Sequence, residues 1–299
     1  MLRKESIVLS QQMITFYLAM ISILGDRFKE RLGLSYNDFT LLSALSECES
    51  GVGMRPLYEY VMLSRNTILP ALTRLEDASY VAKETQPDDS RYALCHLKAT
   101  AEPVVRAEVH EANLFLSNTF LRQLPTEECE LLTRGIKCSN NLMRGKSVAQ
   151  FAETGRKTQM LTDYMIGFRC FIRHCEKRIK ATSPLSLSEY RILKTLCECD
   201  ELSPSNLAAM LCMQRSNVTL YKNKLKQRGL IMEKGVAEDR RQIVLQPSHQ
   251  AFSALGPIDE ALGDLVRLWH SPFENDLIDV LNVWYMRFYS NLRRYLDGK

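Results

Sequence analysis

One stretch of the sequence predicts both a fold and a surface: Gln214–Arg241, QRSNVTLYKNKLKQRGLIMEKGVAEDRR. In its first half Val218, Tyr221 and Leu225 recur three and four residues apart, the spacing that buries one face of a helix. Gly229 suits the left-handed conformation that ends a helix, and a two-stranded hairpin is expected after it. The stretch holds eight Lys and Arg against three Asp and Glu, a net charge of +5. A basic helix followed by a basic hairpin suits a DNA major groove and the phosphates beside it.

The size and composition of the chain are those of a soluble protein with two domains. Its 299 residues correspond to two domains at roughly 150 residues each. The hydrophobic and charged fractions, 45% and 25%, argue against disorder. Because the formal net charge is only +4, affinity for a polyanion has to come from local clustering.

Neither a membrane segment nor a disulfide framework is expected. The most apolar stretch, Ile7–Leu24, is interrupted by five Ser, Gln and Thr residues, and the N-terminus lacks the pattern of a secretory signal. Nine cysteines, an odd number, are scattered along the chain, which favours reduced thiols. We therefore expect a cytoplasmic protein without membrane contact.

Hydrophobic periodicity predicts a mostly α-helical chain with two short hairpins. A long amphipathic helix is expected over 7–32, and β-prone runs over 80–97 predict a hairpin. Further helices are expected over 37–47, from Pro56, and over 64–78, 102–124, 127–143 with Thr126 as its cap, 158–180, 206–211, 250–270 and 274–297.

This order of elements occurs twice in the sequence. Ser35 recurs as Ser186, a separation of 151 residues, and one loop residue is then deleted. At the resulting separation of 150, the matched pairs include Arg65 and Arg215, Ile68 and Val218, Leu75 and Leu225, Asp89 and Asp239, and Arg91 and Arg241. The sequence therefore predicts a tandem duplication.

The repeated pattern resembles the winged helix-turn-helix of MarR-family regulators. The resemblance rests on the helix order and on a hairpin carrying Asp-x-Arg, within EDRR at 238–241 and DDSR at 88–91. Two fused copies resemble the two-winged-helix regulators of the staphylococcal accessory regulator group, in which one chain imitates a dimer. The resemblance implies a mostly α fold with small β-hairpin wings, in which a helical, dimerisation-like bundle joins two winged helix-turn-helix domains. Their expected bounds are 1–145 and 159–299, with a linker at 146–158.

The same resemblance implies a DNA-binding transcriptional regulator, a repressor relieved by a small-molecule effector. Its partner would be a pseudo-palindromic operator in double-stranded DNA, bound by a monomeric pseudo-dimer or by a homodimer. In the C-terminal copy, Ser203 is expected to cap a helix that starts at Pro204, ahead of the recognition helix. The alternative for that recognition helix is a solvated basic face. The candidate DNA contacts on it are Arg215, Ser216, Asn217, Thr219, Lys222, Asn223 and Lys226.

The hairpin adds contacts of two kinds. Arg240 and Arg241 are expected to reach an adjacent minor groove, where narrow A·T tracts attract Arg. Asp239, and Asp89 in the first copy, are expected to brace the hairpins by pairing with arginine.

The N-terminal copy departs from this pattern. Its charge over Ser64–Arg91 is −1, and Ser79 replaces the terminating glycine. Ser64 is expected to cap the recognition helix, and the alternative cap is Thr67, which would place Pro70 in the first helical turn. On the outer face, Leu69, Leu72 and Glu76 are expected where the other copy has Thr219, Lys222 and Lys226. DNA contacts in this copy are limited to Arg65, Asn66, Thr67 and Arg91. An operator with one well-defined and one degenerate half-site is therefore expected.

The effector is expected to bind between the long helices and the winged helices. Phe16, Tyr17, Met20, Tyr164 and Phe168 lie on the helices that would line such a pocket. Aromatic and Met stripes at helical spacing are more often core, which is the alternative.

Other classes of function have weaker signals. No phosphate-binding Gly loop, Gly-x-Ser-x-Gly or His-Glu-x-x-His is present, so an enzyme is not expected. Cys170, His174 and Cys175 lack further ligands for a metal, and neither metal nor cofactor is expected. The alternatives to a regulator with strong DNA binding are a redox sensor that uses Cys48, Cys197 or Cys199, and a protein-interaction module that uses the apolar final helix.

Overall fold

The computed structural model describes residues 11–48, 51–86, 89–144, 160–236, 239–273 and 278–298, without the side chains of 85–86, 89–93, 236, 239–242 and 278–279. The chain divides into two compact units. Unit 1 joins the described residues up to Ala19 to Phe171–Tyr289, and unit 2 joins Met20–Cys170 to the residues from Ser290. Each unit thus combines residues from both sequence repeats. The bounds 1–145 and 159–299 stay predictions about the duplication, and the linker at 146–158 lies outside the described residues.

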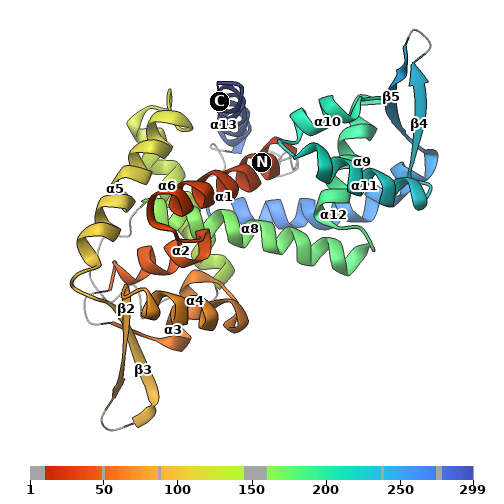
Figure 1. Ribbon diagram of the computed structural model, residues 1–299. Helices are drawn as coiled ribbons and strands as arrows, with labels where there is room; N and C mark the ends of the chain where they lie inside the picture. The colour runs from red at the N-terminus through yellow and green to blue at the C-terminus, as the bar shows by residue number, and fades with distance from the viewer. Residues whose placement is uncertain are drawn as a thin grey trace. The chain divides into compact units, whose positions relative to one another are not determined.

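Apart from strand β1 of the first repeat, the two repeats have the same order of elements (Figure 1). The first comprises α1 (Gln11–Leu32), α2 (Tyr36–Leu45), β1 (Val52–Gly53), α3 (Met54–Val61), α4 (Arg65–Asp77), β2 (Val81–Gln86), β3 (Asp89–Leu97), α5 (Glu102–Thr119) and α6 (Thr126–Arg144). The second comprises α8 (Met160–Thr182), α9 (Leu187–Cys199), α10 (Pro204–Met210), α11 (Arg215–Gln227), β4 (Ile231–Val236), β5 (Asp239–Pro247), α12 (His249–His270) and α13 (Ile278–Asp297). We refer to α2–β3 as the N-terminal winged helix and to α9–β5 as the C-terminal winged helix.

Equivalent capping boxes begin the second helix of each repeat. Ser35 accepts a hydrogen bond from the backbone N–H of Asp38, whose carboxylate accepts one from the Ser35 backbone. Ser186 and Glu189 do the same at the start of α9. Each box satisfies two N–H groups that a helix start leaves unpaired, so the Leu-Ser signal of the repeat has a local structural cause.

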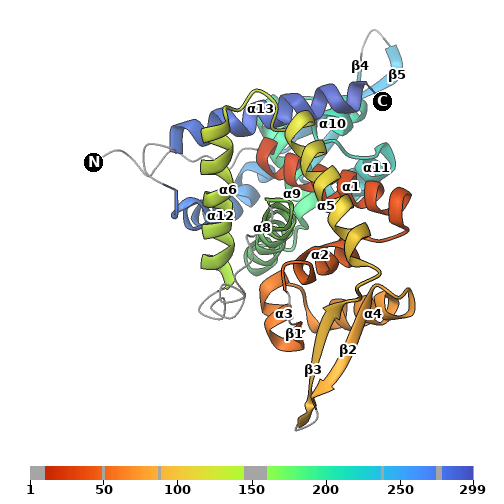
Figure 2. The same ribbon diagram turned by 90° about the vertical axis from the view of Figure 1, so that its left-hand side faces the viewer.

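The wings share one register. β2 pairs antiparallel with β3 and β4 with β5, and the registers shift at Thr85/Gln86 and Gly235/Val236, again 150 residues apart. β1 adds a strand to the first sheet through Val52 and Cys95, and the equivalent residues Leu202 and Leu245 form a single bridge. Figures 1 and 2 show β2 and β3 as a ribbon that extends away from α3 and α4. The short strand β1 was missed in the sequence because its glycines indicate a chain break.

Left-handed residues occur at matching turns. Met62 and Cys212, in the turn before each recognition helix, have φ of +52° and +49°. Ser79 and Gly229, which follow α4 and α11, have φ of +62° and +70°. A side chain is disfavoured in this region, so Ser79 adopts with strain the conformation that Gly229 adopts freely.

Aromatic side chains form the centres of both units. In unit 2, Phe28 stacks on Phe39 with ring centroids 4.0 Å apart. In unit 1, Phe171 lies between Tyr17 and Trp269, at centroid distances of 5.5 and 5.3 Å. All five side chains are almost completely buried, which accounts for the apolar stripes of the long helices.

Three local predictions in the N-terminal repeat are wrong. Helix α4 begins at Arg65, with Ser64 and not the alternative Thr67 at the cap position, so Pro70 lies inside the helix. Because proline has no N–H, the Asn66 carbonyl receives no bond from position 70. The helix expected over 102–124 ends at Thr119. At the start of α6, Thr126 is the first helical residue rather than the cap.

The described helices include none that combines the length and hydropathy needed to cross a bilayer.

Candidate DNA interface

The first turns of α11 present polar side chains to solvent. Arg215, Ser216 and Asn217 are exposed, and Thr219 and Asn223 continue the exposed row. The opposite face is closed, since the side chains at 218 and 225 are completely buried. Thr219 donates a hydrogen bond back to the Arg215 carbonyl, at 3.0 Å. The structure therefore brings five of the seven expected helix contacts together on one open face.

The remaining two contacts, Lys222 and Lys226, are engaged inside the protein. The Lys222 ammonium lies 2.6 Å from Oε1 of Glu233 on β4, and Lys226 donates to Oε2 of the same carboxylate. The two hydrogen bonds hold the pKa of Glu233 below its usual range. The sequence analysis missed Glu233 because nothing local links a strand carboxylate to a helix seven residues earlier.

A second ion pair ties the end of α11 to the start of α9. Arg228 donates to the Pro184 carbonyl at 3.3 Å and lies 3.4 Å from a carboxylate oxygen of Glu189, the capping residue. Lys224 lies over the Tyr221 ring, with the ammonium 5.5 Å from the centroid. These contacts fix the C-terminal half of α11 and leave its N-terminal half to present the polar row.

The turn between α10 and α11 is anchored from beneath by two long side chains. Arg191 of α9 donates to the Leu211 carbonyl at 2.7 Å and to the Thr15 hydroxyl at 2.8 Å. The Tyr289 hydroxyl donates to the Met210 carbonyl at 2.7 Å. Burial lowers the pKa of Arg191 to about 10, because an apolar environment disfavours the charged form. Two carbonyls at the C-terminal end of α10 thus depend on residues outside the helix-turn-helix.

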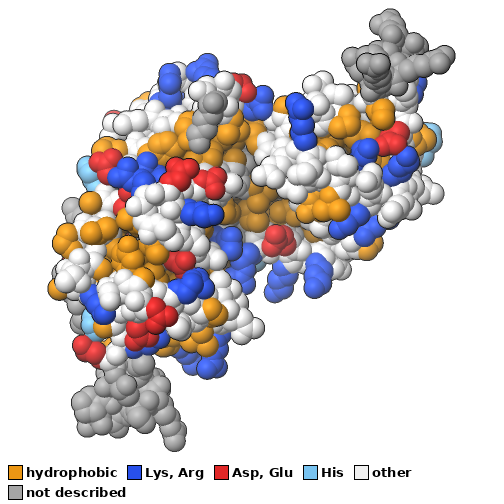
Figure 3. Space-filling model, viewed as in Figure 1, with side chains coloured by type: hydrophobic (Ala, Val, Ile, Leu, Met, Phe, Trp, Pro, Cys, Tyr) orange, Lys and Arg blue, Asp and Glu red, His pale blue; other side chains and the backbone are white. Residues whose placement is uncertain are grey.

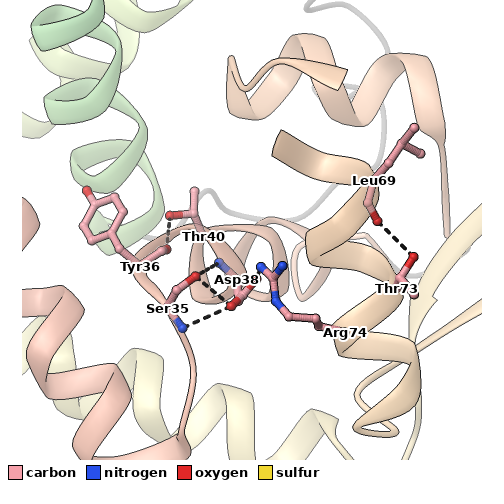
Figure 4. A network of polar contacts seen from close by, with 7 residues as sticks. All are labelled: Ser35, Tyr36, Asp38, Thr40, Leu69, Thr73 and Arg74. Atoms are coloured by element: carbon pink, nitrogen blue, oxygen red, sulfur yellow. Dashed lines mark hydrogen bonds and ion pairs between the residues drawn. The ribbon is translucent and has the colours of Figure 1, made fainter. Parts of the chain in front are cut away.

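In the N-terminal winged helix, one of the two arginines of α4, Arg74, is used internally (Figure 4). Arg74 donates to a carboxylate oxygen of Asp38 at 2.6 Å, and Asp38 is the capping residue of α2. The capping residue of α9, Glu189, is also paired with an arginine, but Arg228 is equivalent to Ala78 and not to Arg74, so the two pairs come from different helix positions. Thr73, next to it, donates to the Leu69 carbonyl at 3.1 Å.

The open face of α4 is less polar than that of α11. Arg65 and Asn66 are exposed and Thr67 is half-buried, with its hydroxyl 2.8 Å from that of Ser64. Leu69 is 39% exposed. The expected outward position of Leu72 is wrong, because that side chain is completely buried. Its counterpart Lys222 also lies partly inward, against Glu233, so the two positions are equivalent but neither faces fully outward.

Glu76 of α4 pairs with Lys83 of β2 at 2.6 Å. It occupies the position equivalent to Lys226, and Lys83 that of Glu233. On the face shown in Figure 3, charges of both signs intermix over the N-terminal winged helix, whereas Lys and Arg predominate over the C-terminal one. The charge asymmetry predicted from the sequence is therefore visible at the surface.

The expected wing contacts lie where the structure describes the backbone but not the side chains. This applies to Arg91, Arg240 and Arg241, and to the bracing residues Asp89 and Asp239. Their backbone belongs to β3 and β5, and their roles stay predictions.

The residues expected to line a ligand pocket are core residues. Phe16 lies against Phe288 at a centroid distance of 5.3 Å, and Tyr164 against Phe168 at 5.6 Å. The hydroxyl of Tyr17 is 2.8 Å from that of Tyr285. The exposure of the expected pocket residues is Phe16 2%, Tyr17 1%, Met20 0%, Tyr164 2% and Phe168 2%. Their role as ligand contacts stays a prediction.

The structure adds little support for a redox sensor or for a protein-interaction module. Burial raises the pKa of the Cys197 thiol to about 11, which keeps it protonated and unreactive near neutral pH. Cys48 is buried and Cys199 is exposed. In the final helix, Trp284, Tyr285 and the residues that continue their face are buried, so that face packs inside the protein.

Unit 2 also contains a buried acidic group that the sequence analysis did not find. Asp163 of α8 is 1% exposed, and Asn140 of α6 donates to its backbone carbonyl at 2.8 Å. Burial, and then the charge of Glu47, raise the pKa of Asp163 to about 7, while Arg144 and Lys137 act in the opposite direction. A cluster of this kind carries no periodic signal.

Comparison with known protein families separates the two repeats. The model of the transcriptional regulator SarA/Rot family matches residues 24–106, and that of the MarR family matches residues 185–243. The first match covers the whole N-terminal winged helix with flanking residues, and the second covers the C-terminal winged helix as far as Ile243 in β5. Two separate parts of the chain, one in each repeat, therefore match winged-helix families of transcriptional regulators, as the sequence resemblance implied.

Several solved structures each match less than half of this chain. The regulator BldR from Sulfolobus solfataricus is 26% identical, with 48% of this chain and 99% of BldR covered at a TM-score of 0.38. Sco3205 from Streptomyces coelicolor, a MarR family regulator solved in complex with DNA, is 16% identical, with 38% of this chain and 73% of Sco3205 covered at a TM-score of 0.36. NadR, solved with 4-hydroxyphenylacetate, is 16% identical, with 40% of this chain and 85% of NadR covered at a TM-score of 0.37. No curated protein sequence matches the chain.

Proposed function

We propose that this protein is a DNA-binding transcriptional repressor whose main DNA contact is the N-terminal half of α11 with the adjacent wing. The observation that carries the proposal is the exposed row of Arg215, Ser216 and Asn217 above a fully buried Val218. Guanidinium, hydroxyl and amide groups are those that read guanine and adenine edges in the major groove. Arg240 and Arg241 extend the contact to the neighbouring minor groove and phosphates.

The two repeats contribute unequally. The polar row of α11 has Leu69 as its counterpart to Thr219, and Glu76 as its counterpart to Lys226. An exposed carboxylate repels phosphate and an exposed Leu offers it no hydrogen bond. Contacts from the N-terminal winged helix are therefore limited to Arg65, Asn66, Thr67 and Arg91. A single chain then acts as an unequal pseudo-dimer, which reads one well-defined and one degenerate half-site.

Matched substitutions in the two recognition helices test this function. Genomic footprinting first identifies a bound site, and fluorescence anisotropy then measures affinity for that duplex. Replacing Arg215 and Asn217 by Ala is expected to weaken binding by at least about 100-fold, since each bidentate base contact contributes roughly 1–3 kcal/mol. Replacing the equivalent Arg65 and Thr67 is expected to weaken it by less than about tenfold. Equal losses, or two equally protected half-sites, would contradict the unequal roles.

We further propose that a small molecule relieves repression. The support is the aromatic core around Tyr17, whose hydroxyl meets that of Tyr285 and, through it, Nε2 of His270 at 3.1 Å. An apolar compound with one polar group suits such a lining if the core opens. Thermal unfolding with a panel of small aromatic acids and phenols, followed by anisotropy with the compounds that stabilise the protein, tests the idea. Stabilisation without loss of DNA affinity would exclude relief of repression by that route.

A further inference from the structure

In the ion cluster between α11 and β4, two lysine side chains share one carboxylate. Oε1 of Glu233 accepts from Lys222 and Oε2 from Lys226. Lys226 is 53% exposed and Glu233 21%, whereas Lys222 is only 15% exposed. The cluster therefore borders the open face of α11 with a net charge of +1 instead of +2.

DNA phosphates compete with Glu233 for these ammonium groups. A lysine that contacts phosphate releases counterions only if its charge is not already neutralised by a protein carboxylate. Transfer of either lysine to phosphate would leave one oxygen of Glu233 without its ion-pair partner beside a polyanion, which is an unfavourable position for a charge. The lysines are consequently less available to phosphate than their sequence positions indicate.

We propose that Glu233 is a specificity-determining residue, which withholds Lys222 and Lys226 from phosphates and so penalises non-specific DNA complexes. This inference rests on the proposed function of α11. Non-specific binding depends almost entirely on phosphate contacts, so it bears the full penalty. Operator binding gains base contacts from Ser216, Asn217 and Asn223, which are uncharged and independent of Glu233. Loss of the carboxylate therefore strengthens binding to random DNA more than binding to the operator.

The N-terminal repeat supports the assignment of a charge-dependent role. Its equivalent pair, Glu76 and Lys83, keeps the contact at 2.6 Å with the signs exchanged. Bracing of the wing against the recognition helix therefore works with either polarity. What differs between the copies is which sign lies on the recognition helix, and only a Lys on that helix needs a carboxylate to restrain its contact with phosphate.

Glu233→Gln tests the proposal, with Asp264→Asn as the control. Asp264 is an exposed carboxylate of α12 paired with Arg267, so its replacement changes the net charge equally without touching the cluster. Anisotropy measures affinity for the footprinted operator and for a random duplex between about 50 and 200 mM salt. We expect Glu233→Gln to raise affinity for random DNA by about fivefold or more and to steepen its salt dependence by one to two phosphate contacts. Operator affinity is expected to change less than about twofold, and Asp264→Asn to leave both affinities within that range.

Several results would overturn the assignment. An equal gain for both duplexes would show a general charge effect, and a loss for both would show that Glu233 only positions the helix. No change in either would show that the lysines never meet phosphate. Where Glu233→Gln lowers the unfolding temperature, Glu233→Asp, which shortens the carboxylate reach, provides the comparison and is expected to give a smaller shift in the same direction. A wild-type protein that binds neither duplex would instead contradict the proposed function.

Discussion

Lys226 of α11 donates to Glu233 of β4, and the residues 150 positions earlier, Glu76 and Lys83, form the same helix-to-wing ion pair with the charges exchanged. The fold therefore requires a link at this place but not a particular polarity. Polarity instead determines whether the recognition helix presents a cation or an anion beside its open face. This single pair expresses the difference between the two repeats more directly than their net charges do.

Exchanging the pair in the C-terminal repeat is expected to weaken DNA binding without loss of stability. The double variant Lys226→Glu/Glu233→Lys keeps the ion pair and the net charge, and the carboxylate it introduces on α11 can also pair with Lys222 one helical turn earlier. A carboxylate beside phosphate is expected to weaken operator binding by about tenfold or more. Anisotropy and thermal unfolding check both statements. Parallel losses of affinity and unfolding temperature would show that the polarity is structural.

The reciprocal exchange asks whether α4 approaches DNA at all. Glu76→Lys/Lys83→Glu also preserves net charge and the pair, and it places a cation on α4. We expect operator affinity to rise severalfold, because the carboxylate that repels phosphate is removed from α4, while the lysine that replaces it stays paired with the new Glu at position 83. The measurement is anisotropy across a salt series, with the salt slope as a second readout. An unchanged slope would mean that α4 does not contact phosphate.

The sequence predicted features that depend on neighbouring residues and missed those that depend on distant ones. Ser203 and Gly229 signal helix ends through local hydrogen bonding and backbone freedom, and each acts at the predicted place. Glu233 and Arg191 act across elements, and their partners are set by packing that no periodicity encodes. The comparison of repeats at a separation of 150 would have revealed Glu233, because Glu76 and Lys83 mirror it.

Strain at Ser79 predicts a stabilising substitution. Ser79 has φ of +62°, where a side chain costs about 1 kcal/mol relative to glycine. Ser79→Gly is therefore expected to raise the free energy of unfolding by about that amount, and Gly229→Ala to lower it similarly. Urea unfolding measures both.

Ala78 provides the control for Ser79, since it precedes Ser79 with an ordinary φ of −80°. Ala78→Gly is expected to destabilise through the added freedom of the unfolded chain. If Ala78→Gly and Ser79→Gly shifted the free energy of unfolding in the same direction, backbone strain at Ser79 would not be the cause.

Replacing Arg191, which does not face DNA, is expected to lower DNA affinity. Arg191→Met removes the bonds to the Leu211 carbonyl and the Thr15 hydroxyl, leaving buried acceptors unpaired at about 1–3 kcal/mol each. We expect both stability and operator affinity to fall. Thr15→Val, which removes a bond without touching the Leu211 carbonyl, is the control and is expected to lower stability with little loss of affinity. Equal affinity losses in the two variants would show that anchoring the turn is not what matters.

Asp163 is expected to give the stability of the protein an unusual pH dependence. Its pKa is raised to about 7 in the folded protein, chiefly by burial and then by Glu47, against about 3.9 in an unfolded chain. Between these values the unfolded chain releases a proton that the folded protein retains, so stability falls as pH rises from about 4 to about 7. Each pKa unit corresponds to about 1.4 kcal/mol. Asp163→Asn abolishes this contribution and preserves the shape of the side chain.

The advantage of Asp163→Asn over the wild type is therefore expected to grow across that window and to stay constant above it. Urea unfolding at a series of pH values measures the difference, in which the other titrating groups cancel. Asp77→Asn, at an exposed position near the end of α4, is the control and is expected to show no such growth. Parallel pH profiles for Asp163→Asn and the wild type would mean that Asp163 is ionised in the folded protein, stabilised by Arg144 and Lys137 more strongly than burial disfavours it.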